Sequence, residues 1–414
     1  MDSGPHKVTV TVTLDETIQL YTFFDQTRDM QARRTFIAGL GVLAVGSVAW
    51  YTIDGDRSVT ESASWPQFRY NSANVGAPPN TTGPADSVTE QWAFDTGSPV
   101  HSSPAMVDGT VYVGGADGHV YAIDAETGSE QWTFETELRV HSSPAVIDET
   151  VYVGSSDGSV YAIDADDGTE QWVSTDPLAG ELSPTVADGT VYIGDRDNDV
   201  YALDAENGSE QWTFETDGRD DAMDSSPAVV DGTVYIGSRD RNVYALDATD
   251  GSQQWTFEMG EEVHGATGIP SSPVVVDETV YIGSRDRNVY ALNRADGSKR
   301  WAFETSNEVL SSPAVADGTV YVGTSQNVYA LDAETGTEQW TFEAFGRVDS
   351  SPAVVDGTLY VGSNTGMIHA IAVENGTERW SFETDGDVQS SPAVVDRTLY
   401  VGSNDGHVYA LKEQ

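Results

Sequence analysis

Cysteine is absent from this chain of 414 residues, and positive charge is scarce: 20 lysine and arginine residues stand against 67 aspartate and glutamate residues, a formal net charge of −47. The absence of cysteine excludes disulfides, thiolate-ligated zinc or iron–sulfur sites, a thiol nucleophile and c-type haem attachment. A body so negative repels nucleic-acid phosphates, so we expect no nucleic-acid binding. The charge instead suits concentrated salt, where the Debye length falls to about 3 Å at 1 M and self-repulsion is screened. We interpret the composition as that of a halophilic protein.

Long uncharged stretches are also rare, and the clearest one follows Arg33-Arg34 and runs from Thr35 to Ile53. Paired arginines ahead of a weakly apolar stretch resemble a twin-arginine export signal, and Ser47-Val48-Ala49 offers a cleavage site. The same 19 residues would also just span a bilayer, so a retained anchor stays equally open. Both alternatives leave the arginines inside and the acidic body outside. We therefore expect an extracytoplasmic protein of the cell envelope, membrane-anchored or secreted.

The chain is predicted to have four parts. Met30 stands three residues before the arginine pair, a usual distance for the start of a signal, so residues 1–29 are interpreted as a mis-assigned N-terminal extension. Residues 30–53 form the signal or anchor, and residues 54–87 a linker and lead-in. Residues 88–414 form a repeat domain.

The repeat is marked by regularly spaced tryptophans, with intervals of 39 to 46 residues. These are Trp92, Trp132, Trp172, Trp212, Trp255, Trp301, Trp340 and Trp380. One Ser-Pro pair accompanies each unit, from Pro104 to Pro392. Internal repeats of this period indicate a propeller, a solenoid or an array.

Turn residues place the strands within a unit. In the first unit Asp108-Gly109, Asp117-Gly118 and Thr127-Gly128 mark turns about ten residues apart, and Asp-Gly between β-branched and aromatic runs favours tight hairpins. The strands predicted between these turns are Ser103–Val107, Thr110–Gly114, His119–Asp124 and Glu130–Thr136. Four short strands per unit are typical of a propeller blade.

The two ends of the repeat are incomplete in complementary ways. Residues 88–95, around Trp92, form a fourth strand without its first three, while the chain stops after Tyr409-Ala410-Leu411, the third strand of the eighth unit. The N-terminal strand is predicted to complete the last blade and close the ring, which removes exposed sheet edges. The predicted fold class is therefore all-β, an eight-bladed β-propeller of four-stranded blades.

The run ALDAENGSEQW, from Ala202 to Trp212, resembles the tryptophan-docking motif of quinoprotein-type, PQQ-like propellers. Trp65-Pro-Gln-Phe68, followed by Asn71 and Asn74, resembles the N-terminal lead-in of that family. The resemblance implies that each repeat tryptophan packs between neighbouring blades. Two copies depart from it: Asn293 replaces the aspartate of the motif, and Ala372-Val373 replace its Asp-Ala pair.

Two kinds of function share this fold: quinone- and Ca²⁺-dependent dehydrogenases, and exported scaffolds such as the propeller subunit of the bacterial outer-membrane assembly machinery. All ten tryptophans are accounted for by the repeat, Trp50 and Trp65, which leaves none as the floor of a quinone site. We expect a non-enzymatic scaffold for protein partners, without catalytic residues or cofactor; Ca²⁺ binding has no support in the sequence. A PQQ- and Ca²⁺-dependent dehydrogenase and an envelope ligand sensor stay as alternatives.

The repeat breaks most clearly in units three to five. The connections after Trp212 and Trp255 are longer than in the other units, and they should lie on the same face as the hairpins between second and third strands. Those hairpins carry arginines where other units have Asp-Gly: Arg196, Arg239, Arg241, Arg285 and Arg287. One hypothesis is a site for a protein partner or carboxylate ligand. The alternative is a set of exposed ion pairs, each contributing about 0–1 kcal/mol.

A second set of residues stands two positions before the serine of each Ser-Pro pair, where the first strands approach the axis. Its polar members, predicted to form the mouth of an axial channel, are His101, His141, Glu181, Asp224, Asp349 and Gln389; Pro270 and Leu310 complete the ring. Side chains of the first four could ligate a divalent cation, although a water-lined funnel is the simpler interpretation. Asp195, Asp197 and Asp199 are interpreted as an acidic hairpin, because Val200 stands where a Ca²⁺ loop needs glycine.

Overall fold

The computed structural model describes residues 64–78, 81–174, 182–195, 197–216, 223–260 and 268–414. The chain separates into two compact units, Met1–Ser62 and Ala63–Gln414. The predicted extension and the predicted signal or anchor fall in the first unit and lie outside the described residues. No helix in the described part of the chain combines the length and apolarity that crossing a bilayer requires.

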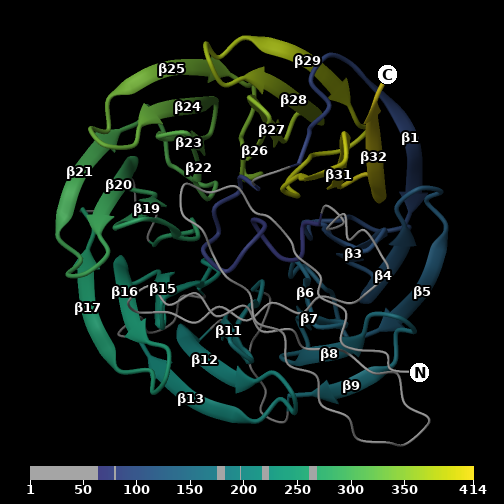
Figure 1. The fold of residues 1–414 in the computed structure, drawn as a ribbon, viewed down its shortest axis with the longest axis horizontal. Coiled ribbons are helices and arrows are strands. Elements are labelled where there is room, and N and C mark those ends of the chain that lie inside the picture. The colour runs from purple at the N-terminus through teal and green to yellow at the C-terminus, as the bar shows by residue number, and fades with distance from the viewer. Residues whose placement is uncertain (1–63, 79–80, 175–181, 196, 217–222, 261–267) are drawn as a thin grey trace, which may run out of the picture. The chain divides into compact units, whose positions relative to one another are not determined.

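The second unit is a ring of eight four-stranded antiparallel sheets, the blades of a propeller, as predicted (Figure 1). Blades one to four comprise β2 (Ala105–Val107), β3 (Thr110–Gly114), β4 (His119–Asp124) and β5 (Glu130–Glu135); β6 (Ala145–Ile147), β7 (Thr150–Gly154), β8 (Val160–Asp164) and β9 (Glu170–Val173); β10 (Thr185–Ala187), β11 (Thr190–Gly194), β12 (Asp199–Asp204) and β13 (Glu210–Glu215); and β14 (Ala228–Val230), β15 (Thr233–Gly237), β16 (Asn242–Asp247) and β17 (Gln253–Glu258).

Blades five to eight repeat this order around the ring. They comprise β18 (Val274–Val276), β19 (Thr279–Gly283), β20 (Asn288–Asn293) and β21 (Lys299–Glu304); β22 (Ala314–Ala316), β23 (Thr319–Gly323), β24 (Asn327–Asp332) and β25 (Glu338–Glu343); β26 (Ala353–Val355), β27 (Thr358–Gly362), β28 (Met367–Ala372) and β29 (Glu378–Glu383); and β30 (Ala393–Val395), β31 (Thr398–Gly402), β32 (His407–Glu413) and β1 (Val88–Asp95).

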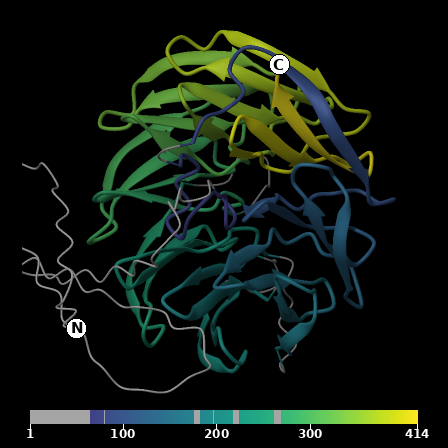
Figure 2. The ribbon, with the colours of Figure 1, turned by 45° about the vertical axis from the view of Figure 1, so that its right-hand side comes forward.

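The ring closes as predicted, because the two ends of the repeat share blade eight. Strand β1 pairs antiparallel with β32, with Trp92 opposite Ala410, and the sheet order is β1-β32-β31-β30. Figures 1 and 2 show the blue N-terminal strand beside the yellow C-terminal one. Each end of the repeat thereby supplies the edge that the other lacks.

The first strand of the first unit is shorter than predicted. In blade one it begins at Ala105 rather than Ser103, because Pro104 has no N–H to donate and the backbone N–H of Ser103 donates to Ser143 Oγ of the next blade (2.9 Å). The fourth strand ends at Glu135, one residue earlier than predicted. The second and third strands have the predicted bounds.

The repeat tryptophans dock each blade on the next, as the family resemblance implies. Trp132 Nε1 donates to the backbone oxygen of Ala165 in blade two (2.9 Å), and the Tyr112 hydroxyl donates to the same oxygen (3.2 Å). The glycine of the motif completes the contact: a Cβ on Gly128 would lie 2.6 Å from the Trp92 ring of the preceding blade. Buried side chains of adjacent blades therefore form shared cores.

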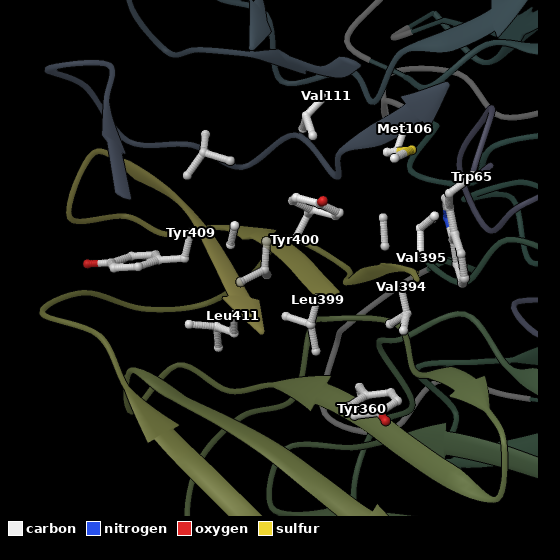
Figure 3. Close-up of a cluster of buried hydrophobic side chains, with 14 of the residues drawn as sticks. Trp65, Met106, Val111, Tyr360, Val394, Val395, Leu399, Tyr400, Tyr409 and Leu411 are labelled. Atoms are coloured by element: carbon white, nitrogen blue, oxygen red, sulfur yellow. The ribbon is translucent and has the colours of Figure 1, made fainter. Parts of the chain in front are cut away.

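The core of blade eight also includes the N-terminal lead-in. Trp65, Met106 and Tyr400 belong to one buried cluster that reaches Tyr360 of blade seven (Figure 3). Trp65 thus belongs to a core shared by residues of blades one, seven and eight, and the core at the ring seam includes the lead-in as well as β1.

The tight turns between first and second strands generate a prediction about stability. Asp108 and Gly109 both have positive φ (48° and 80°), whereas the equivalent of Gly109 in blade two is Glu149, with φ of 63°. A non-glycine residue in this region costs about 1 kcal/mol or more, partly offset by the greater unfolded-state entropy of glycine. Glu149→Gly should therefore stabilise the protein by about 0.5–1 kcal/mol, measured as a higher thermal midpoint.

The reciprocal substitution Gly109→Glu serves as the matched control and should lower the midpoint by a similar amount. The backbone bond that follows each turn, Ala165 N–H to Glu149 O and Ala125 N–H to Gly109 O, is 2.9 Å long in both blades. A lower midpoint for Glu149→Gly would contradict the assignment of backbone strain to this turn.

Candidate functional site

Residues 65–76, part of the lead-in that precedes β1, run along the inner edges of the first strands and pair with them. Trp65 and Met106 exchange backbone hydrogen bonds (2.6 and 2.8 Å). Further backbone N–H groups donate to lead-in oxygens: Val146 to Pro66, Val229 to Ser72, Val275 to Ala73, Val315 to Val75 and Val354 to Gly76. In blade three the Val186 N–H donates to Gln67 Oε1 (3.2 Å). The lead-in therefore covers strand edges that would otherwise face the axis unpaired.

Polar side chains of the lead-in take up backbone oxygens of the Ser-Pro segments. Buried Arg69 donates from Nη1 to Pro352 O (2.9 Å) and from Nη2 to Pro313 O. Asn74 Nδ2 donates to Pro227 O (3.0 Å) and Pro273 O (3.2 Å). Burial lowers the pKa of Arg69 to about 9. Backbone oxygens thus replace water around a buried guanidinium that would otherwise be costly.

The described residues of the predicted channel mouth all line one axial pocket, with a volume of about 210 Å³. These are His101, His141, Asp224, Pro270, Leu310, Asp349 and Gln389; Glu181 lies outside the described residues. Phe68 of the lead-in also lines the pocket. The sequence pattern therefore placed the ring at the axis, but did not reveal Phe68 beside it.

A second ring, of serines, lines the same pocket. Backbone N–H groups donate to the hydroxyl oxygen of the next blade's serine in seven pairs: Ser103 to Ser143, Ser143 to Ser183, Ser226 to Ser272, Ser272 to Ser312, Ser312 to Ser351, Ser351 to Ser391 and Ser391 to Ser103, at 2.8–2.9 Å. These bonds link the innermost residues of neighbouring blades at seven of the eight junctions, the seam included.

The arginines singled out in the sequence divide into an inner and an outer pair. Arg239 binds both carboxylate oxygens of Asp224 (2.8–3.0 Å), and Arg285 Nη2 lies 3.5 Å from Asp224 Oδ2, at the pocket wall. The outer pair instead contacts fourth strands, with Arg241 to Glu258 (3.4 Å) and Arg287 to Glu304 (3.1 Å). Arg196 lies outside the described residues, as do large parts of the two longer connections.

The opposite wall carries a residue that the sequence reasoning missed. Arg347 Nε donates to Asp349 Oδ1 (2.7 Å), while His101 Nδ1 contacts Gln389 Oε1 (2.9 Å) and the His101 ring lies 4.8 Å from that of His141. Arg347 precedes its ring residue by two positions, as Arg139 precedes His141. Comparing connections by composition as well as by length would have found both arginines.

Within the described residues, no three histidine, aspartate or glutamate side chains are close enough together to hold a metal ion. The eight repeat tryptophans all donate from Nε1 to a backbone oxygen, seven of them to the next blade and Trp380 to Pro84 of the lead-in (2.7 Å). No tryptophan is among the residues that line the described pocket.

These features define a PQQ-like eight-bladed propeller whose axis is lined by lead-in and serine residues. The chain belongs to the family described as outer membrane protein assembly factor BamB, whose model matches residues 84–238, 173–302, 239–344 and 324–414. No curated protein matches the chain.

Solved structures share the fold at low identity. BamB from Moraxella catarrhalis is 20% identical, with a TM-score of 0.70 over 79% of this chain and 100% of its own. The quinohemoprotein alcohol dehydrogenase from Comamonas testosteroni is 16% identical, with a TM-score of 0.73 over 84% of this chain and 80% of its own. The computationally designed Ika8 protein is 18% identical, with a TM-score of 0.69 over 78% and 99%. An assembly factor and an enzyme thus both resemble it, so the likeness shows the fold alone.

The hairpin between β11 and β12 in blade three carries several acidic side chains, on the face of the ring that bears the axial pocket. Asp195 is buried and accepts backbone N–H bonds from Asp197 (2.9 Å) and Asp199 (2.8 Å). Burial raises the pKa of Asp195. Burial, and then the charges of Asp195 and Glu215, raise the pKa of Asp199 to about 6. The ionised form of Asp199 is therefore disfavoured in the folded protein.

This shift predicts a pH-dependent effect of Asp199→Asn. Because the folded-state pKa lies above the ordinary 3.8, ionised Asp199 lowers the free energy of unfolding. This destabilisation is complete above about pH 6 and disappears as the carboxyl protonates below its ordinary pKa. The substitution should raise the thermal midpoint at about pH 8, and the gain should be small near pH 4 and vanish at about pH 3. Blades four to six carry asparagine at this position, at Asn242, Asn288 and Asn327.

Asp167→Asn provides the control of opposite sign. Hydrogen bonds from the Thr169 hydroxyl and backbone N–H lower the pKa of Asp167, so its ionised form is favoured in the fold. Neutralising it should give no gain at about pH 8. A gain for Asp199→Asn that persisted unchanged to pH 4 would refute a titration origin.

Proposed function

We propose that this propeller is a non-catalytic binding module that docks a protein partner on the face bearing the axial pocket. That face is formed by the fourth-to-first connections and the hairpins between second and third strands. Their backbones are hydrogen bonded to one another, as from Met223 N–H to Asp195 O (3.2 Å) and from Ala344 N–H to Gln326 O (2.9 Å). Membership of a family named for an outer-membrane assembly factor supports a scaffold role.

The observation that carries the proposal is Phe345, in the connection between β25 and β26. Its side chain is 78% exposed and its φ is +54°, a combination unfavourable for solvation and for the backbone. The equivalent residue between β1 and β2 is Gly97, with φ of +71°. The adjacent residue, Ala344, replaces a threonine that elsewhere bonds the connection, such as Thr136. The connection after blade six therefore departs from the repeat, and the departure exposes an aromatic ring to solvent.

Hydrogen bonds near Phe345 fix the backbone of the connection that carries its exposed ring. Arg347 N–H donates to Asn364 Oδ1 (2.7 Å), and Asn364 N–H donates to Arg347 O (2.9 Å). On the same face Leu138 is 54% exposed and precedes exposed Arg139. Exposed aromatic and apolar residues beside arginine are enriched in protein interfaces and their hot spots. The arginine hairpins of blades four and five add to this surface.

The dehydrogenase alternative finds less support in the pocket. Its volume of about 210 Å³ is below the roughly 300–1,000 Å³ usual for small-molecule and cofactor sites. Phe68 lies there, and the repeat tryptophans are occupied in blade docking. We further propose, on the sequence alone, a location at the cell envelope of a halophile, with residues 30–53 as the signal or membrane anchor.

Phe345→Ser tests the docking surface directly. Because the ring is exposed, the substitution should leave the thermal midpoint unchanged, whereas loss of a hot-spot aromatic should weaken partner binding by about 2 kcal/mol or more. Photo-crosslinking in native membranes at molar salt, with the crosslinker at Leu138, measures the yield of partner adducts. Phe345→Tyr, which keeps the aromatic ring, should restore them.

Two results would contradict the proposal. Equal adduct yields from wild type, Phe345→Ser and a crosslinker at Asp296, in the outer hairpin of blade five, would show that no specific face is used. Saturable quinone binding with Ca²⁺-dependent dye reduction would establish the dehydrogenase instead.

A further inference from the structure

The serine ring supplies the axial pocket with hydrogen-bond donors. In the seven bonds of the ring, each serine oxygen accepts a backbone N–H, as Ser312 Oγ does from Ser272 (2.9 Å). A serine hydroxyl can accept and donate at once, so each of these groups keeps its own proton for a further acceptor. All eight serines of the Ser-Pro pairs line the pocket.

The acceptors of the pocket wall, in contrast, already have protein donors. Arg239 contacts both oxygens of Asp224, Arg347 Nε donates to Asp349, and Gln389 Oε1 contacts His101 Nδ1. Among the described residues, the wall therefore has hydroxyl protons to donate, while Asp224, Asp349 and Gln389 each already have at least one protein donor. A ligand that fits this balance is rich in acceptors.

The guanidinium of Arg285 carries a positive charge, and only part of it has hydrogen-bond partners. Its Nη2 lies 3.5 Å from Asp224, at the limit of a hydrogen bond, and its Nε is buried without a partner in the described part of the chain. Asp286 of the same hairpin is engaged elsewhere, accepting from the Tyr290 hydroxyl (2.6 Å) and from Gly260 N–H (3.0 Å). Three guanidinium groups, those of Arg239, Arg285 and Arg347, thus contact the two carboxylates of the described wall.

The shape of the pocket limits the ligand to a small molecule or a chain end. A volume of about 210 Å³ is that of about seven liquid water molecules. Phe68, Pro270 and Leu310 contribute apolar surface. The pocket therefore suits a short carbon skeleton that ends in a negatively charged, acceptor-only group.

We propose that the axial pocket binds a small carboxylate, either a free molecule or the C-terminal residue of a peptide. The carboxylate oxygens accept from serine hydroxyls of the ring, Arg285 supplies positive charge next to the wall residue Asp224, and the carbon skeleton contacts Phe68 and Leu310. Charge-assisted hydrogen bonds of this kind are stronger than neutral ones. This site is separate from the Phe345 surface, so its occupancy does not require the protein partner proposed above.

Calorimetric titration of the full chain at constant molar KCl tests the proposal with three probes. Sodium malonate represents a free carboxylate, trialanine a peptide C-terminus, and trialanine amide the same peptide without the carboxylate. We expect saturable binding of malonate, trialanine or both, and none of the amide. Malonate alone would assign a free carboxylate as the ligand, and trialanine alone would assign a chain end.

Arg285→Gln should weaken binding of the active probe by about tenfold, since a positive charge next to the pocket is lost and the Asp224 carboxylate is less neutralised. Arg287→Gln is the matched control, because it removes the same charge from the same hairpin at a residue paired with Glu304 instead of the pocket. It should leave the affinity unchanged. Phe345→Ser should also bind the probe normally, which separates this test from that of the partner surface.

The proposal is overturned if neither carboxylate probe saturates, or if the amide binds as well as trialanine. It is equally overturned if Arg285→Gln and Arg287→Gln lower the affinity by the same factor, since that result would indicate a general charge effect. Thermal midpoints of both variants, measured first, ensure that folded proteins are compared.

Discussion

The hydrogen bond from each repeat tryptophan to a backbone oxygen of the next blade is the interaction on which this ring depends. It fixes neighbouring sheets at one spacing, and the ring then has little freedom in blade number. The motif glycine makes it possible, because a Cβ at Gly128 would collide with the Trp92 ring. At the seam no such blade hairpin follows, and Trp380 donates to Pro84 instead (2.7 Å). The lead-in is therefore part of the docking system, and the seam is joined by β1, Trp65 and Pro84 together.

The inner edges of the first strands, at the axis, also rely on the lead-in. First strands have an inner edge that faces other first strands, too far apart to pair as a sheet. The protein satisfies these edges with the lead-in, whose backbone meets Met106, Val146 and Val229 in turn, and with the serine ring. Arg69 and Asn74 serve the remaining backbone oxygens. Because the unit repeats eight times, serine hydroxyl groups surround the axial pocket. Only the residues that differ between units make the pocket asymmetric and determine its charge.

The repeated acid and the unrepeated arginines have different consequences. Acidic residues such as Asp124 recur around the outer hairpins, where the Asp124 carboxylate accepts from Thr127 of the same turn, a distribution that suits solvation in salt. Arg239 and Arg285 break the pattern and converge on Asp224, from hairpins 46 residues apart in the chain. Their common hairpin position predicted one neighbourhood, but not the division into an inner pair at the pocket and an outer pair at Glu258 and Glu304. That division follows from the turn itself, where Arg241 and Arg287 have positive φ (74° and 69°) and so leave the direction taken by Arg239 and Arg285.

The sequence alone determined the number of blades, their strands and the closure of the ring, because each depends on local turn chemistry and on a period that eight copies make unambiguous. It also placed His101, Asp224 and Gln389 at the axis, since equivalent positions in a closed ring must meet there. Only the tertiary structure decided what fills that axis and what faces solvent. Nothing in the sequence distinguishes Arg69 from the other arginines, yet it is buried in the fold. Phe345 is a large apolar residue, yet its side chain is exposed in a connection where its φ is positive. Burial is a property of the whole assembled ring, and no local pattern of residues carries it.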